Sequence, residues 1–290
     1  MKKYSYDPKS LKKHGKSFYW ASFFLPNQSK SAASELYSIC RYFDDLADDD
    51  LYDQSDLLIR EFDRIKNDYS HPIKQFFEKN KIPLNFLEDL IKGLLKDQKK
   101  VEIQNEYELI EYSYQVAGTV GLMMSPLILV TERSAKKNAI DLGIAMQLTN
   151  IARDIYEDAK MGRIYLPKEW LGNIEIKDLQ NPTTTPKKKE IKEAIKKLLN
   201  LAELYYLNGL NGMKYIPFKT RLGIFFAAKI YREIGQKIKK NNYEYSSTRI
   251  FLNNFNKIYV AIISIPEFLF LRYLHKSYKT LREKFDNEDI

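Results

Sequence analysis

The sequence predicts an all-α fold, and its composition and its hydrophobic pattern both point that way. Glycine (11) and proline (10) each make up under a twentieth of the 290 residues, too few for the dense turns of β-rich architectures. Apolar residues recur at intervals of three and four, and no segment shows the sustained alternation typical of a half-buried strand. An apolar share of 44% is enough for a substantial core.

The helical period marks about eight segments in order along the chain. It predicts helices over residues 31–47, 55–69, 83–97, 106–130, 135–158, 188–206, 218–240 and 250–274. The clearest loop is 181–186, NPTTTP, which joins two helices whose apolar faces both need partners. We therefore expect a connection within one domain that spans residues 1–290.

The net charge of +9 suits nucleic acid, an anionic membrane surface or a phosphorylated substrate. A nucleic-acid partner is not expected, because the lysines are dispersed or gather in ordinary solvated faces such as 187–197 and 237–240. A single cysteine, Cys40, excludes an internal disulfide. The first residues lack the apolar run of a signal peptide, and 259–274 is too short and too polar to span a membrane. These features predict a cytoplasmic protein, with peripheral attachment to the inner face of the cell membrane as an open alternative.

A first polar stripe lies on the helix predicted over 31–47 and its continuation. At about 100° per residue, Tyr37, Arg41, Asp44 and Asp48 fall within roughly 60° of one another. Two like charges at this spacing cost about 0.2 to 0.5 kcal/mol, and a bound cation would relieve that cost. The alternative interpretation is a solvated acidic helix end over 44–50.

A second stripe, on the helix predicted over 135–158, consists of Gln147, Asn150, Asp154 and Asp158. The rest of that helix is apolar in nearly every direction, so the helix should be buried. Unpaired charge is not stable in a dry core, so these side chains should face a water-filled or ligand-filled interior. A fully satisfied buried polar network is the alternative.

Two facing carboxylate stripes suit Mg²⁺ ions that carry a diphosphate. Magnesium prefers oxygen ligands and is usually held by one or two carboxylates, waters and substrate phosphate oxygens. The sequence has only three histidines and one cysteine, which do not make a zinc site.

Longer motifs surround both stripes. Residues 147–158 read QLTNIARDIYED and 162–167 read GRIYLP; the supporting pieces are 14–18 HGKSF, 36–45 LYSICRYFDD, 112–121 YSYQVAGTVG and 231–235 YREIG. On these motifs, which span most of the chain, the sequence resembles the squalene/phytoene synthase family. Residues 141–171 are most similar to the bacterial phytoene synthases within it. The resemblance implies an isoprenoid (terpenoid) synthase fold, a single helical bundle around a central cavity.

The resemblance also implies an activity. It is the Mg²⁺-dependent head-to-head condensation of two geranylgeranyl diphosphates, through a cyclopropylcarbinyl (prephytoene) diphosphate, to phytoene, the first step of carotenoid biosynthesis. Mn²⁺ is an alternative ion, NADPH is not expected for phytoene, and contact with a downstream desaturase is open. Squalene or dehydrosqualene synthesis from two farnesyl diphosphates remains an alternative. A non-catalytic helical assembly factor of the same fold is a remote one, disfavoured because both carboxylate pairs are intact.

Site roles implied by the resemblance fall on individual residues of this sequence. The catalytic residues are Asp44, Asp48, Asp154, Asp158, Arg41 and Tyr37. The metal ligands are Asp44, Asp48, Asn150, Asp154 and Asp158. The substrate-binding residues are Ser17, Phe18, Tyr112, Val116, Ala117, Gly121, Gln147, Asn150, Arg163, Tyr165, Tyr231 and Arg249.

Three glycines bear on this site. Gly118 and Gly121 would allow a helix to break or two backbones to approach closely. Gly15 stands where the family commonly has a serine, which removes one hydroxyl near Ser17.

Overall fold

The computed structural model describes residues 4–47, 53–99, 101–130, 132–181, 184–245, 250–270 and 276–284. Within these ranges the regular elements are helices, and the only β-pairing is an isolated bridge between Glu102 and Ile164. The longer helices are α3 (Asn27–Ala47), α4 (Ser55–Asn67), α6 (Asn85–Asp97), α9 (Ala135–Lys160), α12 (Thr185–Leu210), α13 (Phe218–Lys240) and α14 (Asn254–Leu269). The shorter elements are α1 (Ser10–His14), α2 (Lys16–Ser22), α5 (Pro72–Lys79), α7 (Glu106–Ser113), η1 (Tyr114–Gly118), α8 (Thr119–Leu127), α10 (Lys168–Leu171), α11 (Ile176–Gln180), η2 (Asn211–Tyr215) and η3 (Leu281–Lys284).

All eight predicted helices are present within the described residues, although 271–274 of the last lie outside them, and side-chain caps account for two starts that differ from the prediction. The helix predicted from 188 begins at Thr185, because the Thr184 side chain accepts a hydrogen bond from the Lys187 amide and Pro186 suits a first turn. The one predicted from 250 begins at Asn254, where Asn253 accepts a hydrogen bond from the Asn256 amide. The segment predicted over 106–130 divides into α7, the π-helical turn η1 and α8. The short helices α1, α2, α5, α10 and α11 were not predicted.

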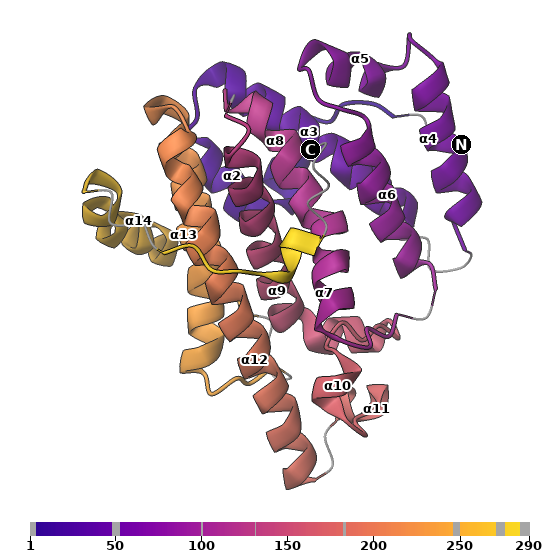
Figure 1. Cartoon of the computed structure of the whole chain (residues 1–290), viewed down its shortest axis with the longest axis vertical. Coiled ribbons are helices and arrows are strands. Elements are labelled where there is room, and N and C mark those ends of the chain that lie inside the picture. The colour runs from indigo at the N-terminus through magenta and orange to yellow at the C-terminus, as the bar shows by residue number, and fades with distance from the viewer. Residues whose placement is uncertain are drawn as a thin grey trace.

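Helix α9 lies at the centre of the bundle and packs against α12, α13, α8 and η1 (Figure 1). Its apolar residues point in several directions and are buried, Ile144 and Leu148 among them, as the sequence predicts. One cluster of buried apolar side chains extends from Tyr4 to Phe268. The second polar stripe therefore stands on a helix enclosed by the bundle.

Two glycines bring α9 unusually close to the helices beside it. A Cβ at Gly143 of α9 would lie 2.3 Å from the carbonyl oxygen of Ala117 in η1. A Cβ at Gly121 of α8 would lie 2.3 Å from the carbonyl oxygen of Ala139 in α9. Backbone therefore packs on backbone here, as predicted for Gly121, and the π-helical turn η1 is the break in the helix.

The C-terminal segment 276–284 crosses the bundle as an extended strap that ends in η3 (Figure 1). Asn208 of α12 and Tyr278 exchange two hydrogen bonds, of 2.9 and 2.8 Å. Further on, Arg282 pairs with Asp141 of α9 at 3.0 Å, and both side chains are buried. The strap therefore ties α12 to α9.

In the part of the chain that the structure describes, no helix is both long enough and apolar enough to cross a membrane.

Candidate active site

An elongated cavity of about 370 Å³ runs through the bundle. Along α9 its lining extends from Ala135 to Asn150, which corresponds to roughly 22 Å of helix axis. Along α3 it extends from Ala33 to Asp44. Most of its wall is apolar, and the cavity therefore has the shape and chemistry of a hydrocarbon tunnel.

Eight of the predicted site residues line this cavity: Phe18, Tyr37, Asp44, Val116, Ala117, Gly121, Gln147 and Asn150. Their polar members come from the C-terminal half of α3 and the middle of α9. The two predicted stripes therefore contribute to one cavity, and their carboxylate and amide groups gather at one end of it.

Asn150 holds an oxygen that has no hydrogen-bond partner. Its Nδ2 donates to Oε1 of Gln147 at 3.3 Å, while its Oδ1 is buried and unsatisfied. Buried polar atoms are nearly always paired, so an orphaned acceptor at the wall of a cavity suits a ligand or a cation.

Asp154 is held by its neighbour in sequence. Arg153 donates two parallel hydrogen bonds to its carboxylate, Nε to Oδ1 at 2.7 Å and Nη2 to Oδ2 at 2.5 Å. Both side chains are largely buried. Bidentate pairing fixes the carboxylate plane, so Asp154 is preoriented one helical turn after Asn150.

Asp158 lies in a concentration of negative charge. Burial, and then the charge of Asp154, raise its pKa to about 7. Asp97 also raises this pKa, whereas Arg163 lowers it. A cation bound here would relieve the repulsion between these carboxylates.

The donor set fits Mg²⁺ as a partial site. No three Asp, Glu, His or Cys side chains form a metal-binding group among the described residues. Magnesium does not need one, because it keeps several waters and shares its coordination with phosphate oxygens. The predicted ligand Asp48 lies outside the described residues, as does Arg249.

Tyr112 and Tyr165, both predicted to contact substrate, share one carboxylate. Their hydroxyls donate to Asp97 at the end of α6, at 2.9 and 2.8 Å. Burial raises the pKa of both phenols, so they remain protonated donors. The bridge between 101–103 and 164 holds the segment that carries Arg163 and Tyr165 against the bundle.

A second aromatic group surrounds Tyr37. The rings of Phe18 and Tyr231 lie 4.9 Å apart. Burial raises the pKa of Tyr37, and Tyr231 adds to that shift. A Cβ at Gly15 would lie 2.9 Å from the ring of Tyr37, so packing leaves little room for a serine here.

The predicted catalytic residue Arg41 and the predicted substrate-binding residue Ser17 lie beside the cavity without lining it. Arg41 forms an ion pair with Asp45 one turn later on α3. Ser17 lies on α2 and is half-buried. Next to it, Lys257 of α14 extends its Nζ to within 3.4 Å of the carbonyl oxygen of Lys16. Burial and the charge of Lys16 lower the pKa of Lys257, so this end of α2 would favour an anion.

The family model for squalene/phytoene synthase matches residues 11–256 of this chain. The chain belongs to the squalene/phytoene synthase family. It is 33% identical to a phytoene synthase of Rhodobacter capsulatus over 84% of this chain and 76% of that protein. A phytoene synthase of Thermus thermophilus is 31% identical, over 91% of both chains. A dehydrosqualene synthase crystal structure matches with a TM-score of 0.79 and 29% identity, over 91% of this chain and 95% of that one.

Three residues that contact predicted site residues or lie beside them were not predicted from the sequence: Asp97, Arg153 and Lys257. Asp97 ends a predicted helix and meets its tyrosines only in the folded chain. Arg153 stands inside the recognisable motif, but only its rotamer shows that it holds Asp154. One feature of the sequence could have identified Lys257, because it is the only charged residue in the largely apolar segment 250–266.

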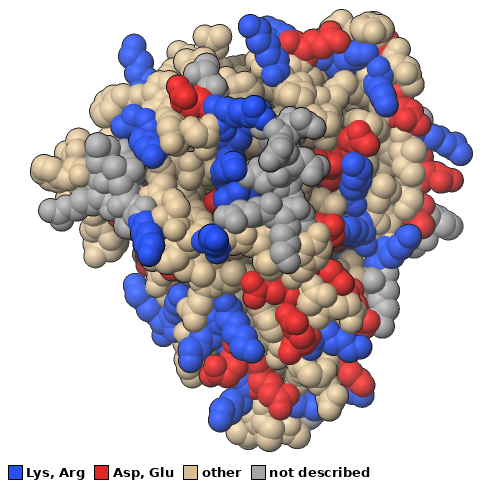
Figure 2. Space-filling view, viewed as in Figure 1, with Lys and Arg blue, Asp and Glu red and all other residues tan. Residues whose placement is uncertain are grey.

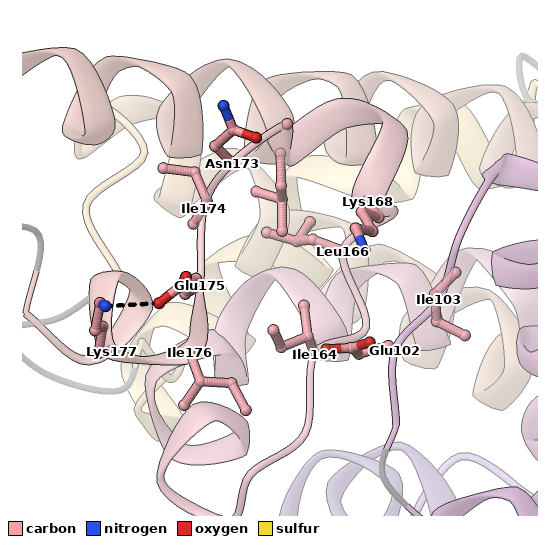
Figure 3. Close-up of a pocket in the computed structure, with 12 residues that line it drawn as sticks. Glu102, Ile103, Ile164, Leu166, Lys168, Asn173, Ile174, Glu175, Ile176 and Lys177 are labelled. Atoms are coloured by element: carbon pink, nitrogen blue, oxygen red, sulfur yellow. Dashed lines mark ion pairs between the residues drawn. The ribbon is translucent and has the colours of Figure 1, made fainter.

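A second hollow, of about 770 Å³, lies between 102–103 and 164–177 (Figure 3). Its walls include the exposed ion pair of Lys177 and Glu175, at 2.7 Å. None of the predicted site residues lines it, and most of its polar lining is exposed. We assign the reaction of this synthase-family chain to the smaller cavity, because the smaller cavity joins the carboxylates to an apolar interior.

Proposed function

We propose that this chain condenses two molecules of geranylgeranyl diphosphate head to head, through prephytoene diphosphate, to phytoene. One observation carries the proposal: the apolar cavity ends at the carboxylate and amide groups of Asp44, Gln147 and Asn150. A prenyl diphosphate has the same division, with a charged head and a long apolar tail. The similarity to phytoene synthases supports geranylgeranyl diphosphate as the substrate.

Asp44, Asn150, Asp154 and Asp158, together with Asp48, would hold Mg²⁺, with Mn²⁺ as an alternative. The orphaned oxygen of Asn150 and the raised pKa of Asp158 both support a cation at this end of the cavity. Bound Mg²⁺ would neutralise charge on the diphosphate and so make it a better leaving group.

The first step breaks the C1–O bond of one substrate, and diphosphate leaves with the electron pair. The double bond of the second substrate attacks the allylic cation, and loss of a proton closes a cyclopropane ring. The apolar wall from Val116, Ala117 and Gly121 excludes water, which would otherwise quench the cation. The rings of Phe18 and Tyr37 line the cavity and Tyr231 packs against Phe18, so these aromatic rings would stabilise positive charge nearby.

In the second step the cyclopropylcarbinyl diphosphate loses its own diphosphate, rearranges and loses a proton. We assign Tyr112 and Tyr165 to shaping the site at this stage, because both phenols are held by Asp97, whose charge also acts on Asp158. Lys16 and Lys257 would attract a diphosphate near Ser17. No reductant is required, so NADPH is not expected.

The alternative product is a C30 hydrocarbon made from two farnesyl diphosphates. The likeness to the dehydrosqualene synthase structure favours this alternative. The site assignments would be the same for either chain length, because the charged head groups are identical.

A product assay tests the proposal. Purified protein with Mg²⁺ receives geranylgeranyl or farnesyl diphosphate, with and without NADPH, and the extracted products are resolved by chain length. We expect a C40 product that does not require NADPH and is abolished by Asp154→Ala, while the surface control Asp63→Ala is fully active. A C30 product alone would move the chain to the dehydrosqualene or squalene branch, and no turnover would favour a non-catalytic role.

We also propose that residues 1–290 act as one cytoplasmic domain. Contact with a downstream desaturase stays a prediction.

A further inference from the structure

Helix α14 exposes many large apolar side chains to solvent, which is unusual for a helix of a globular bundle. Its outward side carries large apolar residues: Phe255, Ile258, Tyr259, Ile262, Ile263, Ile265 and Leu269. Phe255 is 83% exposed and Ile262 is 59% exposed. The inward side buries Val260, Ala261 and Phe268, together with Lys257 and Ser264. A helix that is apolar on its buried side and also exposes this many large apolar residues indicates a surface that is covered in use.

Further exposed apolar residues extend this surface. Phe251 precedes α14 and Phe270 follows it, and both are exposed. Phe218, at the start of α13, is exposed and packs against Phe268 of α14 with ring centroids 5.6 Å apart. We call the outward residues of α14 with Phe218, Phe251 and Phe270 the α14 face. Figure 1 places α14 at one edge of the molecule beside α13, and Figure 2 shows tan side chains at that edge.

The α14 face lies on the cationic side of the protein. Residues 217–270 contain nine Lys and Arg against three Asp and Glu, and residues 1–30 contain seven against one. These two segments therefore carry +12 together, whereas the remainder of the chain carries −3. In the fold they are neighbours, because α13 packs against both α2 and α14.

Lysines stand next to the apolar side chains. Lys219 is exposed and directly follows Phe218, and Lys16 is exposed beside the N-terminal half of α14. Glu267, the one acidic residue of α14, is paired with Lys229 at 2.7 Å. The described residues at the border of the α14 face thus present ammonium groups, and the charge of the Glu267 carboxylate is neutralised by Lys229.

We propose that the α14 face docks on an anionic lipid bilayer, with its apolar side chains in the interface and the lysines of α2 and α13 against the head groups. An amphipathic helix with cations at its border is the form in which proteins lie on such membranes. Each lysine or arginine near the surface adds to the attraction. A second copy of this chain is disfavoured, because a twofold interface would bring two strongly cationic surfaces together.

Docking through the α14 face would place the active-site cavity close to the lipid bilayer. Helices α2 and α13 both line the cavity, through Phe18 and Ala21 and through Ile224 and Ala227, and α13 packs on α14. An apolar substrate or product would then travel a short path between bilayer and cavity. This consequence depends on the proposed function, whereas the docking itself rests on the surface alone.

Vesicle flotation tests the proposal directly. The full chain is mixed with vesicles of phosphatidylcholine, with or without phosphatidylglycerol, at low and high salt. We expect flotation that needs phosphatidylglycerol and weakens with salt. Phe255→Glu/Ile262→Glu should lower the affinity on the order of tenfold or more, because it places two carboxylates in the apolar face.

The matched control is Ile59→Glu/Tyr69→Glu, which adds the same two charges at exposed apolar positions on and beside α4. This control should float nearly as well as the unchanged protein. Flotation of the α14 variant equal to that of the control would overturn the proposal. A second result would also overturn it: the unchanged protein does not float, sediments as a dimer, and becomes a monomer when the α14 variant is introduced. The α14 face would then be a self-association interface.

Circular dichroism checks that each variant is folded. Product formation in detergent micelles separates this proposal from the proposed function, since we expect both double variants to remain active there. Flotation without turnover of the unchanged protein would contradict the proposed reaction and leave the docking surface standing.

Discussion

The rings of Tyr112 and Tyr165 stack with centroids 5.0 Å apart, and their hydroxyls donate to opposite oxygens of Asp97. One carboxylate therefore fixes two phenols that come from distant parts of the chain. The charge of Asp97 also acts on Asp158, so the three side chains lie near the C-terminal end of the second polar stripe. Asp97 is a positioning residue, since it acts through the two tyrosines.

Asp97→Asn should lower kcat by about tenfold to a hundredfold, the usual cost of losing a residue that orients a site. The amide offers one acceptor oxygen, so one of the two phenols loses its partner. We expect KM to change much less than kcat, because the apolar tunnel that binds the substrate tail is unaltered. Steady-state kinetics and thermal unfolding give both quantities.

Asp89→Asn is the matched control on the same helix. Asp89 accepts a longer hydrogen bond from Tyr114, at 3.4 Å, and lies outside the cavity lining. It should leave kcat nearly unchanged. A kcat for Asp97→Asn equal to that of this control would show that the shared carboxylate does not position the tyrosines for the reaction.

The stability of the metal-free protein should depend on the protonation of Asp158. Its pKa is raised to about 7 in the folded chain, whereas the pKa of an aspartate in an unfolded chain is about 4. Between these values the folded state keeps a proton that the unfolded state has lost, so the free energy of unfolding falls as pH rises. Asp158→Asn removes this dependence.

Thermal unfolding in EDTA at about pH 5 and about pH 8 measures the effect. The unchanged protein should lose more stability over this interval than Asp158→Asn does. At the higher pH, Mg²⁺ should raise the melting temperature of the unchanged protein by more than that of the variant. Parallel pH curves for the two proteins would be inconsistent with a buried, charge-crowded Asp158.

The sequence predicted the two polar stripes because a stripe is a local pattern. Gln147, Asn150, Asp154 and Asp158 share one side of α9 by helical period alone, and α9 is enclosed as its apolar residues require. No local pattern shows that α3 and α9 face each other across one cavity; this was expected because both carboxylate stripes need a shared cation, and the resemblance implied it as well. Asp97 gave no local sign, because its partners are 15 and 68 residues away.

The short elements were beyond prediction for a different reason. Helices such as α1 and α2 span fewer than two full turns, too few for a hydrophobic period to be recognised. The π-helical turn η1 shifts the register of its helix without changing the residue types. It lies where Gly143 and Gly121 bring α9 close to η1 and α8.

Gly143→Ala should destabilise the protein by about 1 to 3 kcal/mol, the cost of overpacking a tight interface. The new methyl group would lie 2.3 Å from the Ala117 carbonyl oxygen, and backbone atoms cannot move aside as a side chain can. Because Ala117 and Gly143 both line the cavity, turnover should fall as well. Denaturant unfolding and the product assay measure the two effects.

Gly235→Ala on α13 is its control. There the nearest atom to a new Cβ is Cδ2 of Leu199 at 3.3 Å, the end of a flexible side chain. Alanine has the higher helix propensity, by up to about 1 kcal/mol, so this variant should be neutral or slightly stabilised. Equal losses of stability in both variants would argue against a backbone-to-backbone contact at Gly143.

Substrate length should be limited at the end of the cavity away from Asp44. Ala33 lines the cavity on α3, eleven residues before Asp44, which is roughly 16 Å along the helix axis. Ala33→Phe would place a ring in the path of a long prenyl chain and leave the carboxylate end untouched. We expect the C40 product to fall sharply and farnesyl diphosphate to become the better substrate.

The exposed neighbour Ser31 provides the control, because Ser31→Phe adds the same ring outside the cavity. Competition between the two substrates, with products resolved by chain length, measures the preference directly. If Ala33→Phe kept the C40 preference of Ser31→Phe, the prenyl chain would have to follow another path. The residues that limit chain length would then be sought at the other end of the lining of α9, between Ala135 and Asn138.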